Sequence, residues 1–280
     1  MNALEAILLG VVQGLTEFLP ISSSGHLILV PWLGDIRYLQ DHPDFNKTFD
    51  VALHLGTLVG VVAYFRAEVV MMVEGAVELV RRRRAETEAG RLALLVAIGT
   101  IPAIIVGGLG ENWIDDHLGE PWQIAILMAV FALLLGYADR RPETREIESV
   151  QPRDALKVGL AQALALAPGV SRSGITITAG RFLGLSRDAA ARFGFFLLVP
   201  VTAGAVAFKG LHVVKDGIPP GQTGPLVLGV IASAISGYAA IWWLLAYVRR
   251  HNYDVFVVYR LVVAVAILVL IATGVRDATF

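Results

Sequence analysis

The stretch GVVQGLTEFLPISSSGH, residues 10–26, recurs 149 positions later as GLAQALALAPGVSRSGI, residues 159–175. Each copy lies in an apolar region, about 2–33 and about 155–185, that proline, glycine and serine interrupt near its middle. Proline breaks the hydrogen-bond ladder of a helix, and each half is too short to cross about 30 Å of hydrocarbon. Each region therefore predicts two half-helices that meet at a turn inside the membrane.

The remaining sequence predicts a helical protein that crosses a membrane several times. Of its 280 residues, 56% are hydrophobic and only 17% are charged, whereas soluble proteins average nearer a quarter charged. Six further stretches are long and apolar enough to span the bilayer, the first with Asp50 and His54 in its opening turns. They lie at roughly 49–65, 91–109, 121–138, 192–209, 225–248 and 255–273. We expect an all-α polytopic membrane protein with six transmembrane helices and two re-entrant hairpins.

The connections between these spans alternate between basic and non-basic, as six crossings require. The basic connections carry Arg66, Arg81, Arg82, Arg83, Arg84, Arg91, Arg140, Arg141, Arg145, Arg153, Lys157, Arg249 and Arg250. The connection between the second and third spans has four acidic residues and no lysine or arginine. This alternation predicts a cytoplasmic location for the arginine-rich loops and an outside location for both termini. A net charge of −1 gives no indication of nucleic-acid binding, and the absence of cysteine excludes thiolate chemistry.

The two copies of the motif belong to an inverted repeat within a single membrane domain, residues 1–280. After a five-residue slip the identities resume at an offset of 144, so repeat 1 covers about 1–140 and repeat 2 about 150–280. Each repeat holds one hairpin and three spans, and an odd number of spans reverses the second copy in the membrane. The hairpins then enter from opposite sides, and their serine-rich tips meet near the midplane, where helix N-termini favour an anion.

The first hairpin carries polar side chains that an apolar segment does not need. Gln13 and Glu17 are four residues apart and share a helix face. After Pro20 come the residues of the turn and the next half-helix: Ser22, Ser23, Ser24, Gly25 and His26. Such groups are costly in a membrane unless they face a polar cavity. A purely structural alternative makes the serines helix caps, with Ser24 capping the second half-helix. That alternative leaves Glu17 and His26 unexplained.

The second hairpin carries a single arginine between two serines. Ser171 and Ser173 flank Arg172, and Gly174 allows close approach of the backbone. The planar guanidinium suits phosphate oxygens, which it can bind in a bidentate manner. The plain alternative is a salt bridge between Arg172 and Glu17 that joins the hairpins. The hydroxyl and N–H donors around Arg172 favour phosphate.

These motifs resemble the undecaprenyl-diphosphate phosphatases, also called bacitracin-resistance proteins, over nearly the whole chain. The family's acidic motif, (E/Q)-x-x-x-E, is similar to QGLTE at 13–17, and its serine–histidine segment is similar to SSSGH at 22–26. Its arginine motif, P-G-x-S-R-S-x-x-T, is matched throughout residues 168–176, which end in Thr176. Many members have glutamate where this chain has Gln13. The resemblance implies hydrolysis of undecaprenyl diphosphate to the monophosphate and phosphate, with Mg²⁺ or Ca²⁺ and a site reached from the extracytoplasmic side of the cell membrane.

Phosphoryl transfer distributes roles among these residues. Arg172 is expected to neutralise the reacting phosphate, with Ser171, Ser173 and Thr176 as helpers. Ser22, Ser24, Gly25 and Gly174 complete the predicted phosphate-binding set. Glu17 and Gln13 are the expected metal ligands, and His26 is the expected general base or acid. The nucleophile is Ser23, one helical turn before His26, or a water that His26 activates.

Several other interpretations stand beside this hypothesis. His54, near the start of the first span, is expected to be a hydrogen-bonded packing residue rather than a ligand, with a place in the wall of the pocket as the alternative. Inverted repeats with broken helices are also the architecture of secondary transporters, so an anion carrier or lipid-phosphate flippase is the rival function. The sequence leaves a homo-oligomer open. A purely structural membrane subunit would leave both motifs unexplained.

Overall fold

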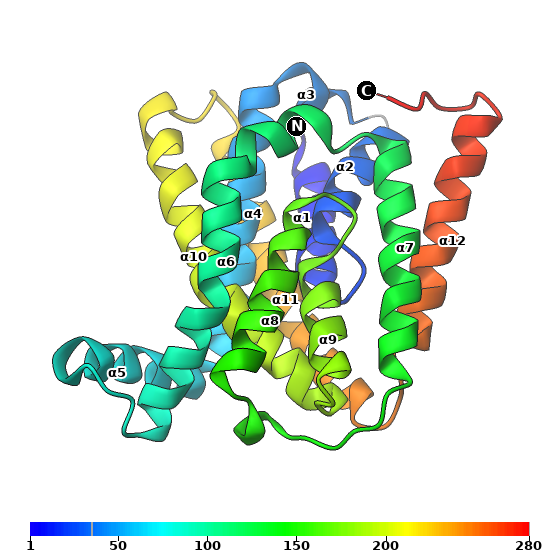
Figure 1. The fold of residues 1–280 in the computed structure, drawn as a ribbon. Coiled ribbons are helices and arrows are strands. Elements are labelled where there is room, and N and C mark those ends of the chain that lie inside the picture. The colour runs from blue at the N-terminus through cyan, green and yellow to red at the C-terminus, as the bar shows by residue number, and fades with distance from the viewer. Residues whose placement is uncertain (35, 280) are drawn as a thin grey trace.

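Both broken regions form pairs of short helices in the computed structural model, which describes residues 1–34 and 36–279. The first pair is α1 (Ala3–Phe18) and α2 (Ser23–Gly34). The second pair is α8 (Pro152–Ala163) and α9 (Arg172–Phe182), with a 3₁₀ turn, η2 (Leu164–Leu166), between them. The longest of the four has 16 residues, fewer than the roughly 20 that a spanning helix needs. In Figure 1 the α1–α2 hairpin enters from the end that holds both termini, and the α8–α9 hairpin enters from the opposite end.

Among the described residues, five helices are long and apolar enough to cross a membrane by themselves. Their spanning parts are Glu88–Gly110, Pro121–Asp139, Arg187–Gly210, Thr223–Val248 and Asp254–Ala272. They belong to α6 (Glu88–His117), α7 (Pro121–Asp139), α10 (Arg187–Asp216), α11 (Thr223–Val248) and α12 (Asp254–Ala272). Two further helices are short: α3 (Arg37–Asp41) and η1 (Ile147–Ser149). No strand forms within the two described ranges. The predicted class, an all-helical protein that passes the membrane several times, is confirmed.

The first predicted span, 49–65, lies inside α4 (Pro43–Tyr64) and differs from the others. It passes the same length and hydropathy test only together with α5 (Arg66–Arg82), to which it is bent by 93°. The first turns of α4 carry Asp44, Lys47 and Asp50, which dilute its apolar character. The number of candidate spans is therefore five, or six when the bent pair is counted as one.

Each hairpin packs against the second long helix of the other half of the chain. Helix α1 packs on α11, and α8 packs on α6. Glycines make both contacts close: a Cβ on Gly10 would lie 2.4 Å from the carbonyl oxygen of Gly229, and one on Gly159 would lie 2.3 Å from that of Gly99. Gly10 and Gly159 are equivalent positions of the two sequence copies. The two contacts hold the hairpin tips within the bundle.

The arginine-rich connections lie together, at the end of the bundle opposite to the two termini (Figure 1). Helix α5 projects sideways from this end, and the connections after α7 and α11 lie at the same end. The arrangement agrees with the alternation of basic and non-basic loops along the sequence. Which end faces the cytoplasm stays a prediction.

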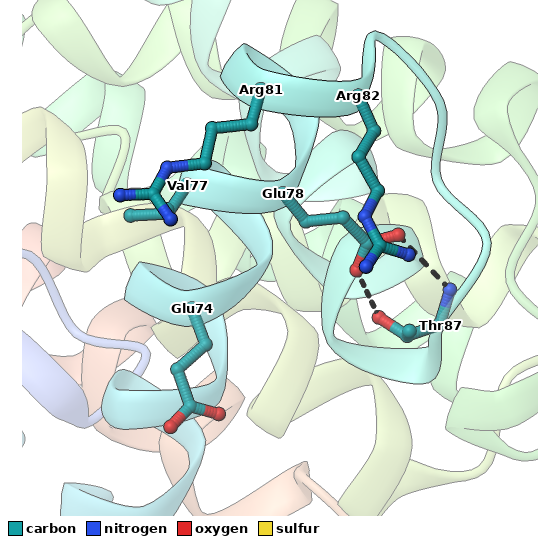
Figure 2. Close-up of a pocket in the computed structure, with 6 residues that line it drawn as sticks. All are labelled: Glu74, Val77, Glu78, Arg81, Arg82 and Thr87. Carbon is teal, nitrogen blue, oxygen red and sulfur yellow. Dashed lines mark hydrogen bonds between the residues drawn. The ribbon is translucent and has the colours of Figure 1, made fainter.

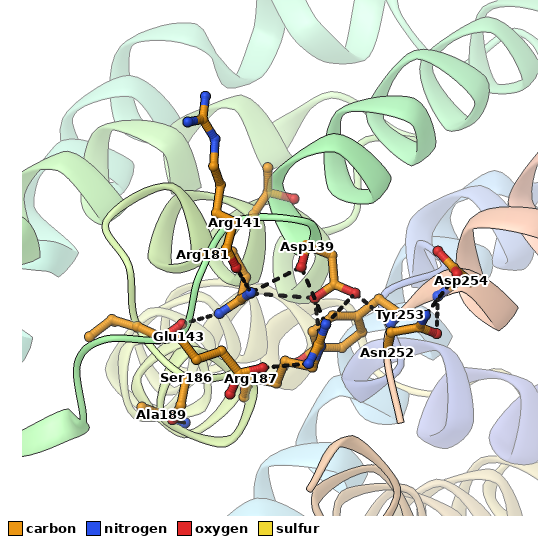
Figure 3. A network of polar contacts seen from close by, with 12 residues as sticks. Asp139, Arg141, Glu143, Arg181, Ser186, Arg187, Ala189, Asn252, Tyr253 and Asp254 are labelled. Carbon is orange, nitrogen blue, oxygen red and sulfur yellow. Dashed lines mark hydrogen bonds and ion pairs between the residues drawn. The ribbon is translucent and has the colours of Figure 1, made fainter. Parts of the chain in front are cut away.

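A buried polar network joins four helices at this end (Figure 3). Asp139, at the end of α7, lies 3.3 Å from Arg181 Nε of α9 and 2.7 Å from Arg187 Nε of α10 through its Oδ1 atom. Its Oδ2 accepts the backbone N–H of Tyr253, just before α12, at 2.9 Å. Asp139 is 4% exposed and Arg181 is fully buried. The network therefore fixes the far end of the second hairpin to its neighbours.

Asp139→Asn is expected to lower the free energy of unfolding by about 3–5 kcal/mol, because it leaves the guanidinium of Arg181 buried without its counter-charge. Thermal unfolding in detergent measures the change. Glu143→Gln is the matched control, since it removes an ion pair to Arg187 from a side chain that is 37% exposed, which is worth less than about 1 kcal/mol. Equal midpoints for the two variants would contradict the prediction.

Candidate active site between the hairpin tips

The two hairpins turn through equivalent serines in an uncommon backbone conformation. Ser22 has φ 80° and Ser171 has φ 76°, a region that residues other than glycine rarely adopt. Each serine precedes the second helix of its hairpin and caps it: Gly25 N–H donates to Ser22 Oγ at 3.3 Å, and Gly174 N–H donates to Ser171 Oγ at 3.1 Å. The cap of α2 is therefore Ser22, and the structural alternative that assigned this role to Ser24 is wrong.

The tips contact each other directly. The N–H of Gly169 in the second tip donates to Ser22 Oγ of the first at 3.2 Å. The hydroxyl of Ser173 donates to the carbonyl oxygen of Leu19 at 3.0 Å. These bonds link segments about 150 residues apart in sequence. The predicted meeting of the two motifs is confirmed for these atoms.

Arg260, a fully buried residue of α12, binds both tips at once. Its Nη1 donates to Pro20 O of the first tip at 3.4 Å, and its Nη2 donates to Gly169 O at 2.9 Å and Val170 O at 3.0 Å in the second. Its Nε donates to Met128 O of α7 at 3.1 Å. Because a guanidinium has five N–H donors in a rigid fork, one side chain serves four carbonyls. Arg260 lies outside both sequence motifs, although an arginine within an apolar span is itself a signal of function.

Glu17 is the centre of the polar cluster beside the tips. Its carboxylate is buried, and its Oε2 accepts hydrogen bonds from Ser23 Oγ at 2.5 Å and Gln13 Nε2 at 3.2 Å. His54 Nε2 lies 3.8 Å from the same oxygen. Arg172 Nη1 lies 3.8 Å from Oε1, so two cationic or potentially cationic groups flank the carboxylate. The structure brings Gln13, Glu17, Ser23 and Arg172 together, as the motifs predicted.

Arg172 begins α9 and reaches the cluster from the second hairpin. Its Nη1 donates to Thr202 Oγ1 of α10 at 2.8 Å. The side chain of Arg172 is 23% exposed, so part of the guanidinium remains accessible. Thr202 is buried, and no sequence signal pointed to it. The 3.8 Å separation from Glu17 exceeds a hydrogen bond, which leaves donors of Arg172 for an anion.

His26 does not meet Ser23 in the structure. Its Nδ1 lies 2.7 Å from the carbonyl oxygen of Ser22, and its Nε2 lies 2.8 Å from the hydroxyl of Tyr259 on α12. A carbonyl only accepts, so Nδ1 carries the hydrogen and the neutral ring accepts from Tyr259 at Nε2. Ser23 instead donates to Glu17. The expected pairing of hydroxyl and imidazole is therefore absent from this conformation.

His54 is the histidine that contacts the cluster. Its Nδ1 lies 2.7 Å from the carbonyl oxygen of Asp50, one turn earlier on α4, and this bond directs Nε2 toward Glu17. Its side chain is 27% exposed. His54 is therefore a hydrogen-bonded residue beside the pocket, as the sequence allowed, and the packing of α1 against α4 brings it to the carboxylate.

The other predicted phosphate-binding hydroxyls are engaged within the hairpins. Ser171 Oγ and Ser173 Oγ lie 3.3 Å apart. Thr176 Oγ1 donates to the Arg172 and Ser173 carbonyls of its own helix, at 2.9 and 3.2 Å. Ser24 is half-buried at the first turn of α2. Their contact with phosphate stays a prediction.

Comparison with known proteins identifies the family of this chain. The sequence model described as bacitracin resistance protein BacA matches residues 6–266, which include nearly all of both hairpins and four of the five long helices in full. The chain belongs to this family. It is 45% identical over 277 residues to the undecaprenyl-diphosphatase of Pelobacter propionicus, covering 98% of this chain and 99% of the relative. It is also 45% identical over 270 residues to that of Geobacter sulfurreducens, covering 96% and 98%.

The BacA-family site has oxygens suited to a divalent cation. Glu17 Oε1 and Gln13 Oε1 are both buried and accept no hydrogen bond from the described residues. Carboxylate and amide oxygens of this kind are the ligands that Mg²⁺ and Ca²⁺ prefer. The described part of the chain contains no group of three or more acidic, histidine or cysteine side chains that could hold an ion alone. The residues fit a cation that takes its remaining ligands from a phosphate substrate and water.

Proposed function

We propose that this BacA-family chain is an undecaprenyl-diphosphate phosphatase, which converts the diphosphate lipid and water to the monophosphate lipid and phosphate. The observation that carries the proposal is the position of Ser23 and Arg172 on either side of Glu17, at 2.5 and 3.8 Å. The substrate is proposed from the 45% identity, over nearly the whole chain, to proteins named undecaprenyl-diphosphatase. Through this reaction the carrier lipid of cell-wall synthesis is recycled.

Binding of the diphosphate begins with Arg172. Its guanidinium is held by Thr202 at 2.8 Å and projects from the N-terminus of α9. The N-termini of α2 and α9 both lie at the tips, and their N–H groups and dipoles favour negative charge. These groups stabilise the charge that develops on the phosphate during transfer. Thr202 is a positioning residue for this arginine.

Ser23 is the proposed nucleophile, and Glu17 accepts its proton. The Ser23 Oγ–phosphorus bond forms while the bridging oxygen–phosphorus bond breaks, and undecaprenyl phosphate leaves. A water molecule then attacks the phosphoserine, releases phosphate and restores the hydroxyl. The 2.5 Å contact between Ser23 and Glu17 supports this assignment over His26 as the immediate base. His26 retains a supporting role, since it ties the first tip to Tyr259.

Glu17 Oε1 and Gln13 Oε1 would hold the divalent cation. When bound, Mg²⁺ or Ca²⁺ would neutralise charge on the phosphate oxygens. The chain has one fewer carboxylate here than a two-glutamate motif provides. We therefore expect weaker retention of the cation in the absence of substrate.

The proposed location is the plasma membrane, with the active site open to the extracytoplasmic side. The arginine-rich connections at one end of the bundle support a cytoplasmic position for that end. Both termini would then lie outside. A cavity of about 660 Å³ opens at the end of the termini and reaches Asp50, one turn from His54, which supports access from that side.

Purified protein in detergent is expected to release phosphate from undecaprenyl diphosphate with added Mg²⁺ or Ca²⁺. Chelation with EDTA should reduce the rate at least about tenfold, and excess cation should restore it. Phosphate release is followed by a colorimetric assay. Release that no cation condition supports would refute the phosphatase proposal and favour the flippase or anion-carrier alternative, which counterflow in liposomes measures. Full activity in EDTA would refute only the metal.

Arg260→Lys is expected to lower kcat roughly 10- to 100-fold with little change in KM, because a lysine cannot serve four carbonyls and the tips shift. Steady-state kinetics measures both constants. Arg91→Lys is the control: it replaces another arginine bonded to a single carbonyl, Val150 O, at 2.7 Å and remote from the tips. A kcat equal to that of Arg91→Lys would contradict a positioning role for Arg260.

A further inference from the structure

Helix α5 has an exposed apolar stripe with no protein covering it. Val70, Val73, Val77 and Val80 are 54%, 60%, 44% and 80% exposed. At 3.6 residues per turn they fall within an arc of about 80°. The opposite side of α5 carries Gly75, where a Cβ would lie 2.0 Å from Ala89 O of α6. The stripe therefore faces away from the protein.

The position of α5 in the fold identifies what covers this stripe. Helix α4 turns by 93° into α5, and α6 begins its span at Glu88, shortly after α5 ends. The helix thus lies across the bundle axis at the end where the candidate span of α6 begins, and it projects beyond the bundle (Figure 1). An apolar stripe at this level is covered by lipid, as in amphipathic helices that lie in the membrane interface.

The charges at the C-terminal end of α5 indicate the kind of lipid. Four consecutive exposed arginines, Arg81 to Arg84, lie in the last turn of the helix and directly after it. Of the neighbouring acids, Glu68, Glu78 and Glu86 have partners, whereas Glu74 and Glu88 are exposed and form no ion pair within the described residues. Glu78 accepts hydrogen bonds from the Glu86 and Thr87 N–H groups at 2.8 and 3.3 Å and from the Thr87 hydroxyl.

Figure 2 shows Glu78 turned toward Thr87, while the side chain of Arg81 extends away from it. Glu68 lies 3.7 Å from Arg192 of α10, and Glu86 lies 3.7 Å from Arg82. Arg81, Arg83 and Arg84 form no ion pair within the described residues. Three guanidinium groups are therefore available to anionic headgroups.

We propose that α5 is an interfacial helix that binds anionic phospholipids of the surrounding bilayer, with the valine stripe in the acyl boundary and Arg81, Arg83 and Arg84 on the headgroups. The proposal is independent of the phosphatase activity. Each arginine near an anionic surface strengthens binding to the membrane roughly fivefold. The lipid composition therefore determines how tightly α5 binds the bilayer.

Hydrogen–deuterium exchange of full-length protein in nanodiscs tests the proposal. Amides of residues 66–84 are expected to exchange at least about tenfold more slowly in discs containing phosphatidylglycerol than in pure phosphatidylcholine. Arg81→Gln/Arg83→Gln/Arg84→Gln should abolish this difference. The matched control is Arg140→Gln/Arg153→Gln/Arg250→Gln, which removes three exposed arginines from the same end without touching α5, and it should keep the difference.

A second pair of variants separates the apolar part. Val73→Ser/Val77→Ser should speed exchange of α5 in both lipids, whereas Val262→Ser/Val265→Ser, exposed on α12, should leave α5 unchanged. Phosphatase activity in detergent confirms that each variant is folded. Equal exchange of wild-type α5 in both lipids, or equal loss of the difference in the two arginine triples, would overturn the proposal.

Discussion

Arg172→Gln is expected to lower phosphate release from undecaprenyl diphosphate by at least about a thousandfold, while the protein stays folded. An arginine that stabilises a phosphoryl-transfer transition state contributes about 10³–10⁵ in rate. Glutamine keeps much of the volume and the polarity of Arg172, but it has no charge for the phosphate and does not reach Thr202 as Nη1 does. Turnover with saturating substrate measures the effect.

The rival explanation is a structural salt bridge between Arg172 and Glu17. Arg172→Lys distinguishes the two, because lysine restores the positive charge but not the bidentate fork. A structural ion pair predicts recovery of activity in Arg172→Lys and a lower unfolding midpoint in Arg172→Gln. Phosphate binding predicts a rate that stays reduced about 100-fold or more in Arg172→Lys, with a nearly unchanged midpoint. Near-normal turnover of Arg172→Gln would refute the assigned role.

Ser23→Ala is expected to reduce turnover by about a thousandfold or more and to remove any covalent phosphoenzyme. With substrate labelled in its terminal phosphate, acid-quenched wild-type protein should carry label at Ser23, because the Oγ–phosphorus bond forms before water enters. Mass spectrometry of the quenched protein locates the phosphate. The variant should carry none.

Ser236→Ala is the matched control for this loss. Its hydroxyl also donates within the membrane region, to the Ala232 carbonyl at 2.7 Å, and it packs beside α1. It should retain activity within about twofold. If Ser23→Ala lost only about tenfold and wild-type protein carried no label, a water molecule held by Glu17 would be the nucleophile.

Local sequence signals were sufficient for the elements and for one half of the site. Pro20 and Pro168 marked the breaks, and apolar runs marked five of the long helices within a few residues. Gln13 and Glu17 met because they are four residues apart on one helix. The proximity of Glu17 and Arg172 could also be predicted from the sequence, because the inverted repeat requires the two tips to meet.

The parts that escaped the sequence depend on contacts between distant helices. Thr202 looks like an ordinary residue of an apolar span until α10 is placed beside the tips. The predicted contact between Ser23 and His26 was wrong for a local reason. Ser22 adopts φ 80°, a backbone conformation that is rare for serine and cannot be predicted from the residue type. That turn directs Ser23 to Glu17 and the ring of His26 to Tyr259.

The exchange of hairpins between the two halves, α1 against α11 and α8 against α6, bears on how such a chain could arise. Neither half of the chain could complete the pocket alone, because the helix that packs against each hairpin belongs to the other half. Two copies inserted in opposite directions would have supplied it. The glycine contacts at Gly10 and Gly159 each join a hairpin to the other half of the chain.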